Sequence, residues 1–241
     1  MVGEDGAPGG AVDFDATFQA FRARSHTLGP SDGALEEWRR GRSRFAVWVL
    51  RILEHAVVER MARVATALGD AIVPVPAHDA HVTAFVAGFP CAGEPRHDDD
   101  VPWRVLGEQG VALRAALAAP IELHVGGANA CASCAFLDVH DASGALAAAR
   151  HALARIHPEV RFAPYVPHVT VGRFQDTRAA APLAAVLARL RDERPITLTI
   201  GALELVTFDA TDEGHPTLVT ERVVKLGGAE GVAAPRRVVA T

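Results

Sequence analysis

Apolar residues along this chain fall into short runs whose spacing switches between helix-like and strand-like. Phe14, Phe18 and Phe21 recur at the spacing of one helix face, which predicts a short amphipathic helix near the N-terminus. Later runs are rich in β-branched and aromatic residues, which is typical of strands. The predicted helices span 34–40, 54–68, 101–118, 144–156 and 179–190, and the predicted strands span 45–53, 71–75, 81–86, 121–125, 135–139, 167–174, 196–200, 203–208 and 218–226.

Helices and strands alternate, but several strands are joined by short turns, which favours an α+β or mixed-sheet fold over a doubly wound parallel one. We expect one such turn at Gly126-Gly127 and Asn129, and a long polar loop over 88–100.

The chain divides by composition into three parts. Residues 1–42 form an N-terminal extension, partly disordered and with short helices, residues 43–226 form the folded region, and residues 227–241 form a flexible tail.

One short sequence motif occurs twice. His81-Val82-Thr83 is repeated, 87 positions later, as His168-Val169-Thr170, and both copies lie in predicted strands after a proline-containing approach. Because residues i and i+2 of a strand point to the same face, each copy places one imidazole beside one hydroxyl.

Two such pairs suit phosphoester chemistry if the halves of the chain pack about a pseudo-two-fold axis. One neutral and one protonated imidazole can coexist near neutral pH and act as base and acid together. The threonine hydroxyls can donate hydrogen bonds to phosphoryl oxygens as charge builds there. Such a site can direct water at a phosphodiester without a metal or another cofactor.

The repeated motif, and above all the stretch Pro164-Tyr165-Val166-Pro167-His168-Val169-Thr170-Val171-Gly172-Arg173, resembles the two-histidine phosphoesterase superfamily, which includes 2′-5′ RNA ligase-like proteins and 2′,3′-cyclic phosphodiesterases. The resemblance covers residues 43–226. It implies two pseudo-symmetric lobes, each an antiparallel or mixed sheet with helices outside, and a central cleft between them. It also implies that His81, Thr83, His168 and Thr170 are catalytic, and that the protein is an enzyme that opens a 2′,3′-cyclic phosphate.

Three further residues are candidates for binding the substrate. Tyr165 precedes His168 by the same three positions that separate His78 from His81, so both can reach the rim of the site, Tyr165 to stack on a base and His78 as a polar contact. Strand alternation alone would turn Arg173 away from His168, but a bulge near Gly172 would redirect it toward a phosphate. The alternatives are a surface position for Arg173 and a turn position for Tyr165 and His78, and the turn is the favoured interpretation for His78.

Charge and composition limit the kinds of ligand and partner that we expect for this chain. The net charge of −5 provides no basic field for long nucleic acid, so we expect a small cyclic nucleotide or an RNA terminus as the ligand. The N-terminus lacks a signal peptide and no apolar run is long enough for a bilayer, so we expect a cytoplasmic monomer with no membrane partner.

Alternative interpretations remain open at this point. The same site could bind a nucleotide or RNA end without turnover, or act as a 2′-5′ RNA ligase, and His78 and His81 with the acids of 98–100 could serve a metal-dependent hydrolase. Cys131 and Cys134 form a lone C-x-x-C pair without the second pair of a zinc site, which favours small buried thiols.

Overall fold

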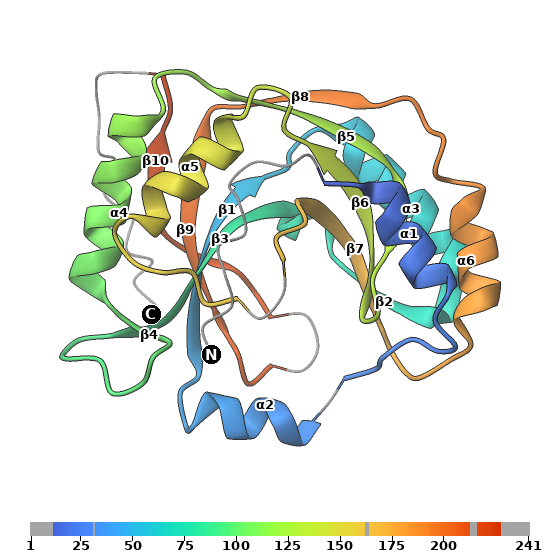
Figure 1. Cartoon of the computed structure of the whole chain (residues 1–241), viewed down its shortest axis with the longest axis horizontal. Helices are drawn as coiled ribbons and strands as arrows, with labels where there is room; N and C mark the ends of the chain where they lie inside the picture. Colours follow the sequence, from blue (N-terminus) through green and yellow to red (C-terminus); the bar gives the residue numbers. More distant parts are fainter. Residues whose placement is uncertain (1–11, 31, 162–163, 213–215, 228–241) are drawn as a thin grey trace, which may run out of the picture.

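A single sheet of ten strands runs through the residues that the structure describes, and its two halves meet at β3 and β7 (Figure 1). The computed structural model describes residues 12–30, 32–161, 164–212 and 216–227. Along the main path the strand order is β10-β9-β1-β3-β7-β6-β5-β8, while β2 pairs with β7 and β4 pairs with β3. The strands are β1 (Arg44–Arg51), β2 (Ile72–Pro74), β3 (His81–Cys91), β4 (Asp100–Pro102), β5 (Ile121–Ala130), β6 (Cys134–His140), β7 (His168–Phe174), β8 (Ile196–Ile200), β9 (Ala202–Asp209) and β10 (Val219–Lys225).

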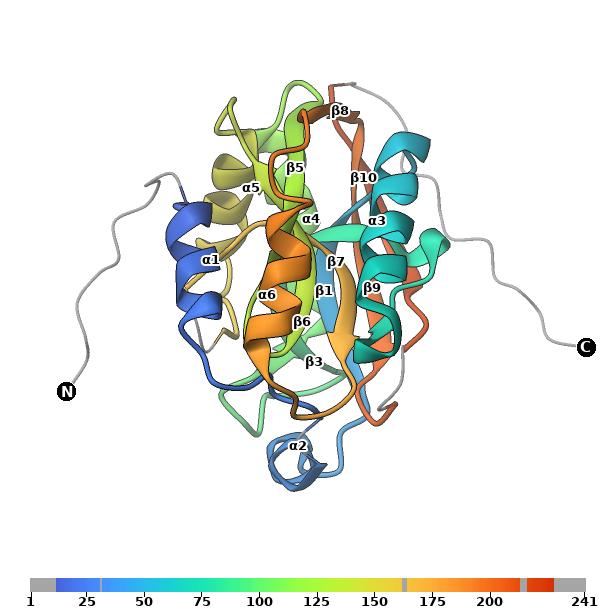
Figure 2. The same ribbon diagram turned by 90° about the vertical axis from the view of Figure 1, so that its right-hand side faces the viewer.

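The helices gather in two groups that accompany the two halves of the sheet (Figures 1 and 2). α4 and α5 lie against β10 and β3, whereas α1, α3 and α6 lie against β5 and β7. The helices are α1 (Phe14–Arg22), α2 (Asp32–Arg39), α3 (His55–Leu68), α4 (Trp103–Ala116), α5 (Ala145–Ala154) and α6 (Ala180–Ala188), with short 3-10 turns η1 (Gly69–Ala71) and η2 (Ala77–Asp79).

The two halves repeat one arrangement. β1, α3, β3 and α4 follow one another in the first half, as β6, α5, β7 and α6 do in the second. The antiparallel pairing of residues 48–51 with β3 recurs for residues 135–138 with β7, at the same offset of 87 positions that separates the two histidine motifs. The structure therefore confirms the α+β fold with two related halves, and it joins them into one sheet at the Val82–Val169 pair.

Alternation along β3 and β7 separates a core face from a second, more polar face. Val82 and Val169 are fully buried in the main core, where each such side chain contributes about 2 kcal/mol to folding. The residues on either side of them in the chain are only partly buried and point to the opposite face.

The N-terminal helix follows its sequence pattern. Phe14, Phe18 and Phe21 are all buried, and the carboxylate of Asp13 caps the helix by accepting a hydrogen bond from the Ala16 amide at 2.8 Å. The predicted amphipathic helix is thus confirmed, and it packs beside α6 (Figure 2).

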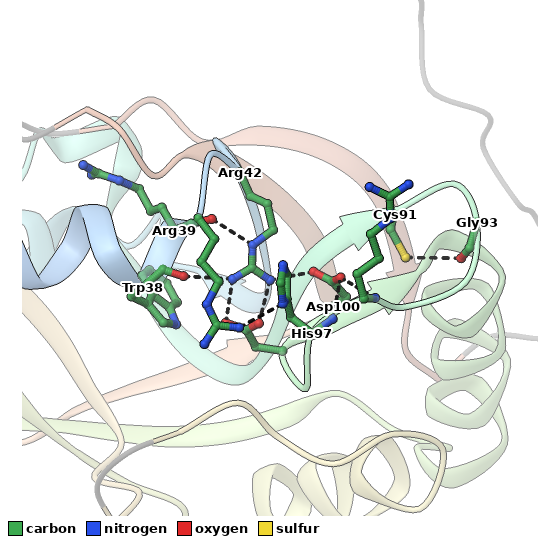
Figure 3. Close-up of polar contacts among 10 residues, drawn as sticks. Trp38, Arg39, Arg42, Cys91, Gly93, His97 and Asp100 are labelled. Carbon is green, nitrogen blue, oxygen red and sulfur yellow. Dashed lines mark hydrogen bonds and ion pairs between the residues drawn. The ribbon is translucent and has the colours of Figure 1, made fainter.

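Arg42 links the end of the second helix of the extension to the sheet (Figure 3). The guanidinium of Arg42 donates hydrogen bonds to the carbonyl oxygens of Trp38 and Arg39 at 2.9 Å each. It also donates to the carboxylates of Asp99 and Asp100, at 2.6 Å each. The end of α2 and the segment before β4 are therefore tied to each other by this mostly buried cation.

Two expectations about loops were wrong. β5 passes through Gly126-Gly127 without turning, and the two glycines form a bulge there. The backbone of Arg191 occupies the place that a Cβ at Gly127 would take. The turn lies instead between Cys131 and Cys134, whose backbones share a 2.9 Å hydrogen bond. The expected loop over 88–100 begins later, since β3 continues to Cys91 and pairs there with β4.

No helix in the described part of the chain has both the length and the apolar character that a membrane span requires. The expected disorder of residues 1–12 and the expected flexible tail of 227–241 lie, except for residues 12 and 227, outside the described residues.

Candidate active site

The two histidine motifs meet on one face of the sheet, at the junction of its halves. Val82 on β3 pairs with Val169 on β7 in antiparallel register. One step to either side of this pair brings His81 opposite Thr170 and Thr83 opposite His168. The two motifs, 87 positions apart in sequence, thus bring together two imidazoles and two hydroxyls.

Each imidazole is oriented by the backbone of its own approach segment. Nδ1 of His81 lies 2.6 Å from the carbonyl oxygen of Asp79, and Nδ1 of His168 lies 2.7 Å from that of Val166. A carbonyl oxygen can only accept, so Nδ1–H is the donor in both cases. This fixes the tautomer and leaves each Nε2 to take or give a proton.

Burial lowers the pKa of both imidazoles. For His81 this effect outweighs the hydrogen bond to Asp79, and the positive charges of Arg51 and His168 lower the pKa further. For His168 burial and the nearby charge of Arg161 outweigh the hydrogen bond to Val166 and the charge of Cys131. The charge of His168 is thus one of the causes that set the protonation of His81.

Matching bulges shape β3 and β7 beyond the motifs. Ala84 is the extra residue in the pairing of β3 with β1, and Val171 is the extra residue in the pairing of β7 with β6. The second bulge breaks the alternation of β7, so that Arg173 joins His168 and Thr170 among its partly exposed residues.

Arg173 is a free cation on this face. Its guanidinium makes no hydrogen bond or ion pair with any residue that the structure describes. Arg51, by contrast, is committed to Asp79 at 3.2 Å and to Glu204 at 3.3 Å.

Tyr165 supports the bulge of β3. Its hydroxyl donates a hydrogen bond to the carbonyl oxygen of Thr83 at 2.9 Å, and Arg150 donates to the carbonyl oxygen of Ala84 at 2.6 Å. The guanidinium carbons of Arg150 and Arg161 lie 3.5 and 5.0 Å from the centre of the tyrosine ring. Tyr165 thus contacts the site through the backbone of Thr83, and at least one face of its ring is occupied by Arg150.

His78 has a different environment from Tyr165, although the two hold equivalent positions before the motifs. It lies in η2 with its side chain 77% exposed, and its Nε2 is 3.5 Å from the carboxylate of Asp79. The structure therefore places His78 at the surface beside the approach to His81.

Two charged residues beside the histidines escaped the sequence interpretation. Arg51 pairs with His81 across β1 and β3, and Asp138 pairs with His168 across β6 and β7. Burial raises the pKa of the Asp138 carboxyl to about 6, against the hydrogen bond that it accepts from Asn129. A charged residue inside the apolar run of 135–139 was the available signal for it.

Apolar side chains continue from the site along the same face of β3. Val49, Val86 and Val160 pack with Phe45 and Phe89 in a second hydrophobic cluster, under the ring of Trp38.

Beside this cluster lies a pocket of about 370 Å³ whose lining includes Trp38, Arg40, Asp98 and Arg161. The indole Nε1 of Trp38 is buried there without a hydrogen-bond partner among the described residues. Arg161, which lines this pocket, is also the cation that lowers the pKa of His168.

In the acidic run of 98–100, two of the carboxylates form ion pairs with an arginine. Asp99 and Asp100 both pair with Arg42, and Nδ1 of His97 lies 2.9 Å from a guanidinium nitrogen of Arg40. Within the ranges that the structure describes, no three His, Cys, Asp or Glu side chains are grouped in a way that could hold a metal ion.

Comparison with known proteins places the chain in a family. A model of the 2′-5′ RNA ligase superfamily matches residues 53–212, which contain both histidine motifs. The chain belongs to this superfamily. Its members are the two-histidine phosphoesterases that the paired motif resembles. No curated protein matches the sequence significantly.

Solved structures share the fold at low sequence identity. Protein TT0787 of Thermus thermophilus is 17% identical, with a TM-score of 0.54 over 77% of this chain and 100% of that one. E. coli LigT in complex with 3′-AMP is 12% identical, with a TM-score of 0.54 over 77% of this chain and 99% of that one. A protein described as a phosphoesterase is 16% identical, with a TM-score of 0.53 over 77% of this chain and 99% of that one.

Proposed function

We propose that the protein is a metal-independent phosphoesterase that hydrolyses a 2′,3′-cyclic phosphate, on an RNA end or a small nucleotide, by general acid–base catalysis with His81 and His168. The observation that carries this proposal is the antiparallel Val82–Val169 pair, which faces each histidine with the threonine of the other motif. The 3′-AMP and phosphate complexes of E. coli LigT, which has the same fold, agree with a nucleotide phosphate as ligand.

In this mechanism Nε2 of His168 takes a proton from the attacking water while the water oxygen forms a bond to phosphorus. The bond from phosphorus to the ribose 3′ oxygen breaks, and His81 delivers its proton to that oxygen. The products are a 2′-phosphate and a free 3′ hydroxyl. Thr83 and Thr170 donate hydrogen bonds to the non-bridging oxygens, where negative charge grows in the transition state.

The nucleoside extends, in this proposal, toward the pocket beneath Trp38. Val160, which lines this pocket, offers an apolar contact, and the unpartnered indole Nε1 of Trp38 offers a donor to a base. Tyr165 and His78 remain proposed contacts at the rim, with Tyr165 acting in addition through the Thr83 carbonyl.

The proposal is tested with a 2′,3′-cyclic-phosphate-ended oligonucleotide and with free 2′,3′-cyclic nucleotides, each assayed in excess chelator. We expect turnover to a 2′-phosphate on at least one of them. Tight binding without product would favour a binding module, joining of RNA ends would favour a ligase, and loss of turnover in chelator would favour a metal-dependent hydrolase.

The lowered pKa values of the two histidines predict an acidic optimum for kcat/KM. The active free enzyme carries one proton on the histidine pair, and a pKa below the ordinary 6.5 means that this proton is lost at lower pH than usual. We expect kcat/KM to peak below about pH 6.5 and to fall as the pH rises through neutrality. The alkaline limb of kcat should lie at higher pH, because a bound phosphate anion favours the protonated imidazole. A kcat/KM that rises steadily from about pH 6 to about pH 9 would contradict this account.

Arg173→Met tests the proposed phosphate contact. Loss of a charge-assisted hydrogen bond costs about 1.5–3 kcal/mol, so we expect kcat/KM to fall about 10- to 100-fold, mainly through KM. Arg104→Met is the matched control, since Arg104 is 68% exposed on α4 and pairs only with Glu108 at 3.9 Å. Equal activity of the two variants would remove Arg173 from the site.

A further inference from the structure

Two cysteines meet at the tight turn between β5 and β6. Sγ of Cys131 lies 3.2 Å from Sγ of Cys134, and only Ala132 and Ser133 separate them in the chain. The turn is closed by the Cys131 amide, which donates to the carbonyl oxygen of Cys134 at 2.9 Å. The two thiols are therefore held in contact by the hairpin itself.

Neighbouring segments fix the backbone of this turn from both sides. The amide of Leu28 donates to the carbonyl oxygen of Ala132 at 2.7 Å, and the amide of Phe174 donates to that of Ser133 at 3.0 Å. A disulfide needs an S–S distance of about 2.05 Å, so the two sulfur atoms, now 3.2 Å apart, have only about 1.2 Å to close.

The two sulfur atoms differ in their protonation. Hydrogen bonds from the Cys134 thiol and the Ser133 hydroxyl lower the pKa of Cys131 to about 5, although burial opposes this shift. The neighbouring thiolate and burial raise the pKa of Cys134. A lowered pKa at Cys131 beside a raised one at Cys134 favours a thiolate next to a thiol, which is the arrangement of a reactive dithiol.

This dithiol borders the candidate active site. Cys134 pairs with Arg173 across β6 and β7, and the charge of Arg173 acts on the Cys134 thiol. The charge of Cys131 acts on His168. Cys91, the remaining cysteine, lies at the end of β3, where its thiol donates to the carbonyl oxygen of Gly93 at 3.3 Å.

We propose that Cys131 and Cys134 form a thiol–disulfide exchange site, which a low-molecular-weight disulfide oxidises to an intramolecular disulfide beside Arg173 and His168. The Cys131 thiolate attacks one sulfur of the small disulfide, whose S–S bond breaks and releases one thiolate. The Cys134 thiol then loses its proton and attacks Cys131 in the mixed disulfide, which releases the second thiolate. The protein gives up two electrons and the one proton of the Cys134 thiol, and with one further proton from water the two released thiolates become two thiols.

Such a disulfide is suited to reversible oxidation rather than to stapling the fold. It closes a loop of only four residues, so it removes little entropy from the unfolded chain. Its formation removes the negative charge of Cys131 from the vicinity of His168 and Arg173. Oxidation should therefore lower the pKa of His168, and any effect on turnover rests in addition on the proposed function.

The test is a thiol count and an intact mass in oxidised and reduced glutathione. We expect the reduced protein to show its three thiols and the oxidised protein to show one, with a mass lower by two hydrogen atoms. Cys134→Ser should stop at a mixed disulfide of glutathione with Cys131, Cys131→Ser should stay unmodified, and Cys91→Ser should form the disulfide as the native chain does. Three thiols in oxidised glutathione, together with an unmodified Cys134→Ser, would overturn the proposal, and so would oxidation that consumes Cys91.

A second readout does not depend on enzymatic activity. The pKa of His168, followed by NMR through the resonance that His168→Asn lacks, should be lower in the oxidised native protein than in the reduced one. The same reagent should leave the pKa of His168 unchanged in Cys134→Ser once the mixed disulfide has been reduced again. An identical pKa before and after disulfide formation would overturn the link between the dithiol and the site.

Discussion

His81→Ala and His168→Ala are each expected to lower kcat/KM on a 2′,3′-cyclic phosphate by at least about 100-fold, the lower range for general acid–base catalysis. Each variant removes one of the two imidazoles: His168 accepts the proton of the attacking water, and His81 donates a proton to the leaving oxygen. The remaining imidazole cannot do both in one step. The double variant should be little slower than either single one, since the pair acts as a unit.

The controls for this result separate catalysis from folding. His55→Ala removes an imidazole that is 84% exposed on α3, and it should retain native turnover. Thermal unfolding of all variants should stay close to that of the native protein, because His81 and His168 make only one backbone hydrogen bond each through Nδ1. Native kcat/KM in either active-site variant would remove that histidine from the mechanism.

Arg42→Ala is expected to lower the free energy of unfolding by about 2–3 kcal/mol, or the midpoint of thermal unfolding by about 5–10 °C. The guanidinium is only 18% exposed, and its loss leaves Asp99 and Asp100 close together without their cation. It also lies 3.8 Å from the centre of the Phe89 ring and holds the last turn of α2. The cost therefore combines unpaired carboxylates with lost packing of the extension.

The Arg42–Asp100 pair also predicts how the stability of Arg42→Ala depends on pH. Burial alone would raise the pKa of the Asp100 carboxyl. Hydrogen bonds from the amides of Arg96 and His97 and from the Arg42 guanidinium outweigh burial and hold this pKa below its ordinary 3.8. A lowered carboxyl pKa stabilises the fold above the unfolded value, and this stability is lost as the pH falls through the folded value. Arg42→Ala should therefore unfold at higher pH than the native chain during acid titration. Arg104→Ala, which breaks an exposed pair, should change neither midpoint, and equal midpoints in Arg42→Ala would contradict the anchoring role of Arg42.

The repeated histidine motif was readable from the sequence because its chemistry and its strand period coincide. Strand alternation alone places His81 with Thr83, and His168 with Thr170, on one face of their strand. It turns the valine between each pair to the opposite, core face. The fold class followed from the same alternation of helices and strands.

Other parts of the site depend on pairing that no local pattern reveals. Residues 48–51 and 135–138 hold equivalent positions but read Trp-Val-Leu-Arg and Ala-Phe-Leu-Asp, so Arg51 and Asp138 had no visible relation to each other or to the histidines. The glycines at 126–127 looked like a turn, because the sequence cannot show that the backbone of Arg191 packs against them. Tyr165 and His78 occupy equivalent places in sequence, yet only the tyrosine has Arg150 to cover its ring.

The most direct test of the two-histidine mechanism compares leaving groups. A ribose hydroxyl must be protonated as it leaves, whereas 4-nitrophenolate leaves without a proton, so a substrate with that group needs the base but not the acid. On a 3′-deoxynucleoside 2′-(4-nitrophenyl phosphate), we expect His81→Ala to recover most of the native rate and His168→Ala to remain at least about 100-fold slower. Recovery by His168→Ala instead would exchange the two roles, whereas recovery by both variants or by neither would contradict a mechanism in which one histidine is the base and the other the acid.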